Sequence, residues 1–239
     1  RLWLRYEPVQ DADLLKKYLQ AVDQIVVEGT SATCFAVRDE LKTGIEGMLG
    51  KEVSFADKPQ SGNILIAGTP ENSAMIRSLE VAEKLEELGS EGYYLFTTSY
   101  RNNRATVITG NTDIGVLYGT FAFLQLLQTG QPIEELSVTE KPAIDLRLLN
   151  HWDNLDGTVE RGYAGNSLWE WHTLPEYKSP RYKDYARANA SVGINGTAIT
   201  NVNANAQVLT AEYLEKVAAL ADVFRPYGLK VYLTARFSA

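Results

Sequence analysis

The spacing of apolar residues predicts alternating helices and strands over the first 140 residues. Apolar positions recur at helical spacing over 11–21 and 31–49, with a short β-branched run between them at 24–28. The continuous apolar run at 63–67 is typical of a strand that is buried on both faces of a parallel sheet.

The same pattern then predicts a long helix, a hairpin and a second, apolar helix. A single helix is expected over 70–89, with a proline in its first turn and a glycine at its end. Two β-rich runs joined by a polar turn predict an antiparallel hairpin over 92–109. The apolar segment 116–127 must pack on that sheet, and the small Gly115 and Gly119 would let the two backbones approach closely.

A change of pattern near Pro142 predicts two domains. Residues 128–142 are interpreted as a connector, because they contain no long apolar run and include two prolines. The predicted domains are therefore 1–141 and 142–239. The first is expected to be an N-terminal α/β accessory domain in which helices cover a mixed sheet.

The second domain shows a strict alternation of strands and helices. Strands are predicted at 143–149, 196–201 and 229–235, and helices at 182–191 and 210–228. Strands that are separated by helices form a parallel sheet, either open or closed into a barrel. Because a complete (β/α)8 TIM barrel needs roughly 250 residues, we expect only its first three strands here, in the front part of a longer protein.

Composition excludes several classes of function. The chain of 239 residues has 23 Lys+Arg, 30 Asp+Glu and a formal charge of -7, which argues against nucleic acids and anionic lipid surfaces as partners. One cysteine cannot form an internal disulfide, and two histidines leave little material for a zinc site, so no metal is expected. No stretch approaches the ~18 apolar residues of a membrane span.

Polar and aromatic residues are concentrated after the predicted strands of the second domain, where ligands bind in βα folds. The loop from Asn150 to His172 holds three of the four tryptophans and both histidines. Asn201 and Arg236 follow the next two strands. This mixture of groups suits a polyhydroxylated, negatively charged ligand, such as a sugar acid. Arg236 is expected to pair either with the ligand or with a neighbouring carboxylate.

Each of these side chains also has a structural interpretation. Trp169 and Trp171 either contact a ligand or anchor the loop, and the anchoring role is less favoured for Trp152, which directly follows a strand. His151 either binds a ligand or fixes the loop by hydrogen bonds. A turn is the preferred interpretation for Asp156, which precedes a glycine. The acidic side chains of this loop that are candidates for catalysis are Asp153, Asp156 and Glu160.

Several short segments resemble the start of the catalytic domain of α-glucuronidases of glycoside hydrolase family 67. These segments are 147–157, 160–165, 167–169, 193–197 and 201–204. The stretch 108–119 and the helix after it resemble the accessory domain that precedes the barrel in those enzymes. β-N-acetylhexosaminidases have a similar accessory domain, so this second likeness is the less specific one.

The resemblance implies an inverting hydrolase without metal or organic cofactor. Its substrate would be (4-O-methyl)-D-glucuronic acid that is α-1,2-linked to the terminal xylose of xylo-oligosaccharides. One carboxylic acid protonates the leaving oxygen and a carboxylate base activates water. The family places both groups on later barrel strands, so no catalytic residue is expected before residue 239. Trp152 would make apolar contact with the uronic acid, and Val202 would lie near the 4-O-methyl group.

From their position at strand ends, further candidates for substrate binding are Asn150, His151, Arg161, Asn201 and Arg236. Two other functions stay open at this point: a β-N-acetylhexosaminidase-like hydrolase, and a non-catalytic carbohydrate-binding α/β protein. The expected partner is an aldouronic acid, and a homodimer of the full-length enzyme stays open. The lone cysteine and the acidic balance favour the bacterial cytoplasm, with secretion as the alternative.

Overall fold

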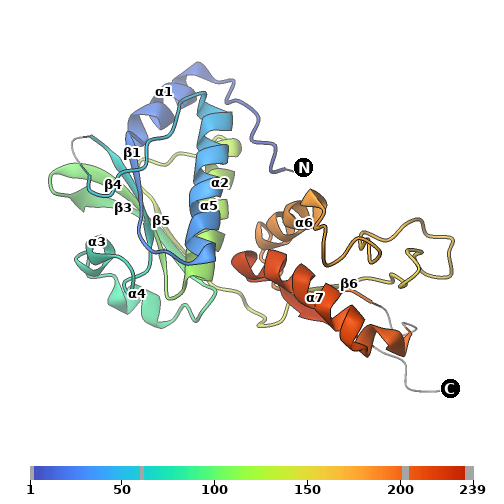
Figure 1. Ribbon diagram of the computed structural model, residues 1–239. Helices are drawn as coiled ribbons and strands as arrows, with labels where there is room; N and C mark the ends of the chain where they lie inside the picture. Colours follow the sequence, from blue (N-terminus) through green and yellow to red (C-terminus); the bar gives the residue numbers. More distant parts are fainter. Residues whose placement is uncertain (1–2, 60–61, 201–204, 235–239) are drawn as a thin grey trace. The chain divides into compact units, whose positions relative to one another are not determined.

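The computed structural model describes residues 3–59, 62–200 and 205–234 (Figure 1). The chain divides into two compact units, which we call the N-terminal unit (residues 1–143) and the C-terminal unit (residues 144–239). The division falls two residues from the boundary predicted at 141 and 142. Both units mix helices with strands, so the predicted α/β class is confirmed.

A mixed five-stranded sheet forms the centre of the N-terminal unit. Its strands are β1 (Gln24–Val27), β2 (Ile64–Gly68), β3 (Tyr93–Tyr100), β4 (Asn103–Gly110) and β5 (Ser137–Glu140). They lie in the order β1-β2-β4-β3-β5. The pairs β1–β2 and β2–β4 are parallel, whereas β3 is antiparallel to both β4 and β5.

The predicted hairpin is confirmed, and its turn explains its register. Arg101 and Asn102 connect β3 to β4, and both have positive φ angles, of 47° and 64°. Two successive left-handed residues form the type I′ turn, whose twist matches that of the flanking strands. The hairpin therefore pairs Tyr100 with Asn103 and Tyr93 with Gly110.

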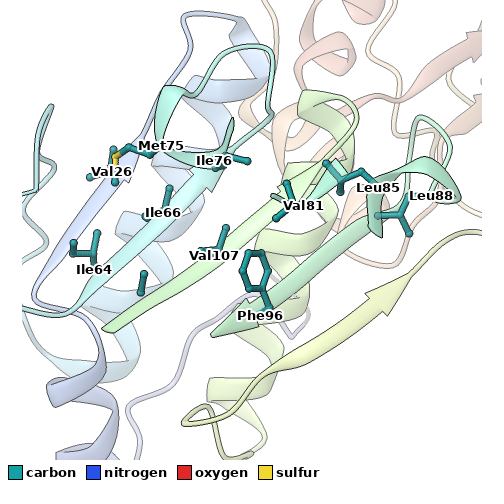
Figure 2. Close-up of a cluster of buried hydrophobic side chains, with 11 residues drawn as sticks. Val26, Ile64, Ile66, Met75, Ile76, Val81, Leu85, Leu88, Phe96 and Val107 are labelled. Atoms are coloured by element: carbon teal, nitrogen blue, oxygen red, sulfur yellow. The ribbon is translucent and has the colours of Figure 1, made fainter. Parts of the chain in front are cut away.

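Helices cover both faces of this sheet. The helices of the N-terminal unit are α1 (Ala12–Ala21), α2 (Ala32–Leu49), α3 (Ala74–Arg77), α4 (Ala82–Glu86) and α5 (Asp113–Gln128). The long helices α2 and α5 pack against each other on one face. Figure 2 shows the opposite face, where Met75, Ile76 and Leu85 of the short helices belong to one buried cluster with Ile66 and Val107 of the strands.

Two sequence predictions for this unit are wrong. The single helix expected over 70–89 is two short helices, because the backbone turns at Glu80, where φ is 54°. Ser73, and not Pro70, begins α3 by accepting a hydrogen bond from the amide of Ile76. Apolar spacing continues across the break because both helices face the same cluster.

The expected connector 128–142 contains strand β5, which lacks an apolar run because only Val138 of its four residues is even half-buried.

Two glycines let α5 lie directly on the sheet. A Cβ atom on Gly115 would lie 2.3 Å from the carbonyl oxygen of Gly92, and one on Gly119 would lie 2.8 Å from Cγ2 of Ile108. Real Cβ atoms do not approach other atoms so closely, so the expected close contact between helix and sheet is confirmed.

The C-terminal unit is built on a three-stranded parallel sheet with the order β6-β7-β8. The strands are β6 (Leu148–Asn150), β7 (Gly196–Ala198) and β8 (Lys230–Tyr232). The helices are α6 (Pro180–Ala190), α7 (Ala211–Phe224) and the 3-10 turns η1 (Ala206–Leu209) and η2 (Arg225–Tyr227). The predicted alternation of strands and helices and the parallel pairing are both confirmed.

The first strand of this unit is shorter than the predicted segment 143–149. Before Leu148, side chains form hydrogen bonds with the main chain. The side-chain amide of Asn195 donates to the Asp145 carbonyl at 2.7 Å and accepts from the main-chain amide of Arg147 at 2.9 Å. The Arg147 guanidinium also donates to the carbonyls of Ile144 and Asp145. Because these backbone groups are already bonded, the segment needs no neighbouring strand.

We expect Gly115→Ala to destabilise the N-terminal unit by about 1–3 kcal/mol, because the new methyl group would overlap the Gly92 carbonyl. This loss exceeds the gain of about 1 kcal/mol in helix propensity. The matched control is Gln125→Ala, at an exposed position of the same helix, which should change the free energy of unfolding by less than about 0.5 kcal/mol. Urea unfolding followed by circular dichroism measures both, and equal effects would contradict the assigned close contact.

Candidate functional site

The residues predicted for ligand binding lie where β6 ends and a long loop begins. Asn150 is the last residue of β6 and is exposed. Trp152 follows two residues later, and its side chain keeps 48% of its surface exposed. His151 lies between them and is largely covered, because side chains of an extended segment alternate between its two sides.

Both nitrogens of the His151 ring face polar side chains. Nε2 lies 2.7 Å from the hydroxyl of Tyr185 in α6, and Nδ1 lies 3.6 Å from Oδ1 of Asp153. The Tyr185 hydroxyl is in turn 2.8 Å from Oγ1 of Thr197 in β7. The main-chain amide of His151 donates to the Ala198 carbonyl at 2.9 Å, which continues the parallel ladder by one residue. The imidazole therefore connects strand β7 and helix α6 to the loop.

The buried side chain of Asp153 anchors the loop. It accepts hydrogen bonds from the Ser167 hydroxyl at 2.6 Å and from the Leu168 amide at 3.2 Å. Burial raises the pKa of this carboxyl, but His151, the Ser167 hydroxyl and the Leu168 amide together outweigh burial and hold the pKa below its ordinary value. Asp153 therefore stays ionised at neutral pH and binds two distant parts of the loop together.

Aromatic packing completes the base of the loop. The Trp169 ring lies 5.1 Å from the His151 ring and 5.3 Å from the Tyr185 ring, both in edge-to-face geometry. Trp169 and Trp171 are 1% and 3% exposed, so both are loop anchors. Trp152 differs from them, since it alone of the three tryptophans in this loop presents a large free surface.

The loop turns back on itself and brings a further predicted residue near Trp152. The Trp152 carbonyl accepts a hydrogen bond from the Glu160 amide at 2.8 Å, and Asp153 forms a bridge with Val159. Arg161, which is exposed, therefore follows directly after a residue that is bonded to Trp152. Asn150, His151, Trp152 and Arg161 are thus grouped at one end of the sheet.

Three predicted residues, Asn201, Val202 and Arg236, lie outside the described residues. The segments that lead to them are joined by side-chain hydrogen bonds. The Thr234 hydroxyl donates to the Thr200 carbonyl at 2.6 Å, and the Thr200 hydroxyl donates to the Thr234 carbonyl at 3.1 Å.

The turn interpretation holds for Asp156, whose exposed carboxylate accepts from the amide and hydroxyl of Thr158 at 2.9 and 2.6 Å. Sequence reasoning missed Tyr185 and Thr197 as partners of His151. A signal was present, because Tyr182 and Tyr185 are three apart in α6 and therefore share the face that packs inward.

Two cavities lie elsewhere in the described part of the chain. A cleft of about 530 Å³ in the N-terminal unit lies after β1, β2 and β4, but Asp113 there already accepts from Ser31 at 2.6 Å and Asn72 at 2.8 Å. A cavity of about 650 Å³ in the C-terminal unit lies beside the loop, and its lining includes Trp171, His172, Arg181 and Tyr213. Among the described residues, no group of three or more His, Cys, Asp or Glu side chains could hold a metal ion.

Comparison with known proteins decides the family. Residues 2–123 match the glycosyl hydrolase family 67 N-terminus, and residues 126–239 match the glycosyl hydrolase family 67 middle domain. The chain belongs to glycoside hydrolase family 67. This family 67 chain is 34% identical to alpha-glucuronidase A of Emericella nidulans and 35% identical to a probable alpha-glucuronidase A of Aspergillus terreus, in each case over 99% of its length. It spans 28% of the length of these relatives.

Solved structures share the fold of this family 67 chain. A family GH115 4-O-methyl-alpha-glucuronidase with specificity for decorated arabinogalactans matches 90% of the chain with a TM-score of 0.60 at 15% identity, over 29% of its own length. A Streptomyces plicatus beta-hexosaminidase matches 96% with a TM-score of 0.54 at 12% identity, over 47% of its own length. In the described part of the chain, no helix is long and apolar enough to cross a membrane.

We expect Asp153→Asn to lower the free energy of unfolding by about 1–3 kcal/mol at pH 7, because the charge is lost and an amide nitrogen must replace one oxygen, where it faces either the Ser167 and Leu168 donors or Nδ1 of His151. The folded pKa of Asp153 is depressed, so its contribution is complete above the ordinary value of about 3.9 and is lost as pH falls through the folded pKa. The difference between the two proteins should therefore shrink below about pH 4. Urea unfolding at a series of pH values measures it.

The control is Asp156→Asn, because the exposed Asp156 side chain forms its turn with Thr158 and asparagine supports the same turn. Its unfolding midpoint should stay close to that of the unchanged protein. An equal and pH-independent loss in both variants would contradict an ionised, buried anchor at Asp153.

Proposed function

We propose that the full-length protein is an inverting α-glucuronidase that removes α-1,2-linked (4-O-methyl)-D-glucuronic acid from xylo-oligosaccharides during xylan degradation. The observation that carries this proposal is the identity of 34–35% with proteins named alpha-glucuronidase A over 99% of the chain. The chemistry at the end of β6 supports it, since Trp152, Asn150 and Arg161 combine an apolar face with amide and cationic groups.

In this proposal the two units have different roles. The N-terminal unit is the accessory domain, and the C-terminal unit supplies the first three strands of a (β/α)8 catalytic barrel. The rest of the full-length protein closes that barrel and carries the acid and the base. Support comes from Leu148 and Leu149 of β6, which are 37% and 40% exposed here and would be covered by further strands.

The substrate site of the proposal is built around Trp152. The C–H groups on one face of a pyranose ring pack well on an indole ring, and Trp152 offers such a surface. Val202 would lie beside the 4-O-methyl group, and Arg236 would pair with the uronate carboxylate. Asn150 and Asn201 would donate to sugar hydroxyls, with Arg161 at the rim of the site.

The same proposal includes the remaining expectations from the sequence. The reaction needs no metal or organic cofactor, because two carboxyl groups and a water molecule suffice for glycoside hydrolysis with inversion. The enzyme would act in the bacterial cytoplasm on short aldouronic acids. The β-hexosaminidase likeness concerns the fold alone, at 12% identity, and does not favour a hexosaminidase activity.

We expect Trp152→Ala in the full-length protein to lower kcat/KM for an aldouronic acid roughly 30-fold, which corresponds to about 2 kcal/mol for the lost apolar contact. The matched control is Tyr177→Ala, which removes another exposed aromatic ring from the segment between β6 and α6 and should leave kcat/KM within about twofold. Release of 4-O-methylglucuronic acid measures both. An unchanged kcat/KM for Trp152→Ala would remove Trp152 from the site.

We also expect the chain of residues 1–239 to release no uronic acid from aldouronic acids under conditions where the full-length protein does. The reason is that the proposed acid and base are carried by other parts of the enzyme. Clear turnover by residues 1–239 would show that the catalytic carboxyl groups lie within this chain.

A further inference from the structure

We propose that His151 and Asp153, with Tyr185 behind them, form a positioning device that fixes the exposed ring of Trp152 for contact with the substrate. His151 then acts through Trp152 and does not itself touch the sugar. The role of Trp152 as a sugar platform rests on the proposed function, whereas the fixing of the main chain that carries its ring rests on the contacts described here.

The first support is the number of anchors around a single exposed side chain. The amide of His151 donates to Ala198, and the carbonyl of Trp152 accepts from Glu160. Asp153 is 4% exposed and Trp152 is 48% exposed, although the two are adjacent. The backbone that carries the indole is therefore fixed before, at and after Trp152.

The second support is the direction of the side chains. In an extended segment, successive side chains point to opposite sides. His151 and Asp153 both point to the side where Tyr185 and Trp169 lie, since they contact each other and the His151 ring packs on both aromatic rings. The indole of Trp152 must point to the other side, which leaves it free to meet a ligand.

The third support is a single consistent direction of hydrogen bonding. Burial raises the pKa of Tyr185, which keeps its hydroxyl protonated at neutral pH. The phenol can accept from the Thr197 hydroxyl and donate to Nε2 of His151, which places the imidazole proton on Nδ1, facing the Asp153 carboxylate. In this series Tyr185 and His151 each donate once and accept once, and the Asp153 carboxylate only accepts, so rotation of the imidazole would break a contact.

Such a device matters because an exposed tryptophan that moves freely loses conformational freedom when a ligand binds, which weakens binding. A ring that is already fixed avoids this cost. Removing the device should therefore raise KM more than it lowers kcat, since the apolar contact is made equally in the bound substrate and in the transition state.

The test is a double-mutant cycle in the full-length protein with an aldouronic acid as substrate. Tyr185→Phe removes only the hydroxyl and keeps the packed ring, and His151→Gln removes the imidazole. We expect each to raise KM about three- to tenfold, and to change KM less than twofold when Trp152 is already alanine. Effects that multiply with Trp152→Ala would overturn the proposal and indicate direct contact between His151 and the sugar.

A second readout does not depend on activity. In protein labelled with fluorotryptophan, the fluorine resonance of Trp152 is identified by its loss in Trp152→Phe. We expect a narrow Trp152 resonance that broadens or divides in Tyr185→Phe and His151→Gln and stays unchanged in the control Tyr177→Ala. An unchanged resonance in both variants would overturn the positioning role.

The two readouts separate the failure of each idea. If the unchanged protein does not cleave aldouronic acids, the proposed function fails, and the Trp152 resonance still decides whether His151 positions the ring. If the protein cleaves them and neither KM nor the resonance responds to Tyr185→Phe or His151→Gln, the positioning device is rejected and the proposed function stands. Circular dichroism of each variant confirms that the fold is intact.

Discussion

The buried carboxylate of Asp153 is the constraint on which the candidate site depends. A charged group in a protein interior must be satisfied by donors, because an unpaired buried charge is very costly. The Ser167 hydroxyl, the Leu168 amide and the His151 ring meet this demand. The first two lie far along the loop, so satisfying one carboxylate closes a long irregular segment into a fixed shape.

The rest of the C-terminal unit supports that anchor. Short parallel strands bring Thr197 next to Tyr185, and the tyrosine reaches His151 from helix α6. Trp169 then fills the space below the imidazole. Polar contacts set the direction of each ring and apolar packing excludes water from them, which strengthens the polar contacts in turn. Trp152 is the one tryptophan of the loop that this arrangement leaves on the surface.

Much of the fold could be predicted from periodicity, because most elements bury one face against the rest of their own unit. The break between α3 and α4 could not, since the apolar spacing of residues 74–88 continues across it. Strand β5 was hidden for the opposite reason: an edge strand with exposed side chains carries almost no apolar signal. The start of β6 was misplaced because side chains of Asn195 and Arg147 bond the backbone before it.

The sequence by itself determined the α/β class, the antiparallel hairpin, the parallel pairing of the last three strands and the segment where chemistry is concentrated. These features follow from local preferences and from which residues avoid water. Only the tertiary structure decided that Trp169 and Trp171 are buried anchors while Trp152 is exposed. The three tryptophans are chemically identical, but Trp169 and Trp171 are covered by aromatic residues of α6 and α7, which no local pattern in the loop contains.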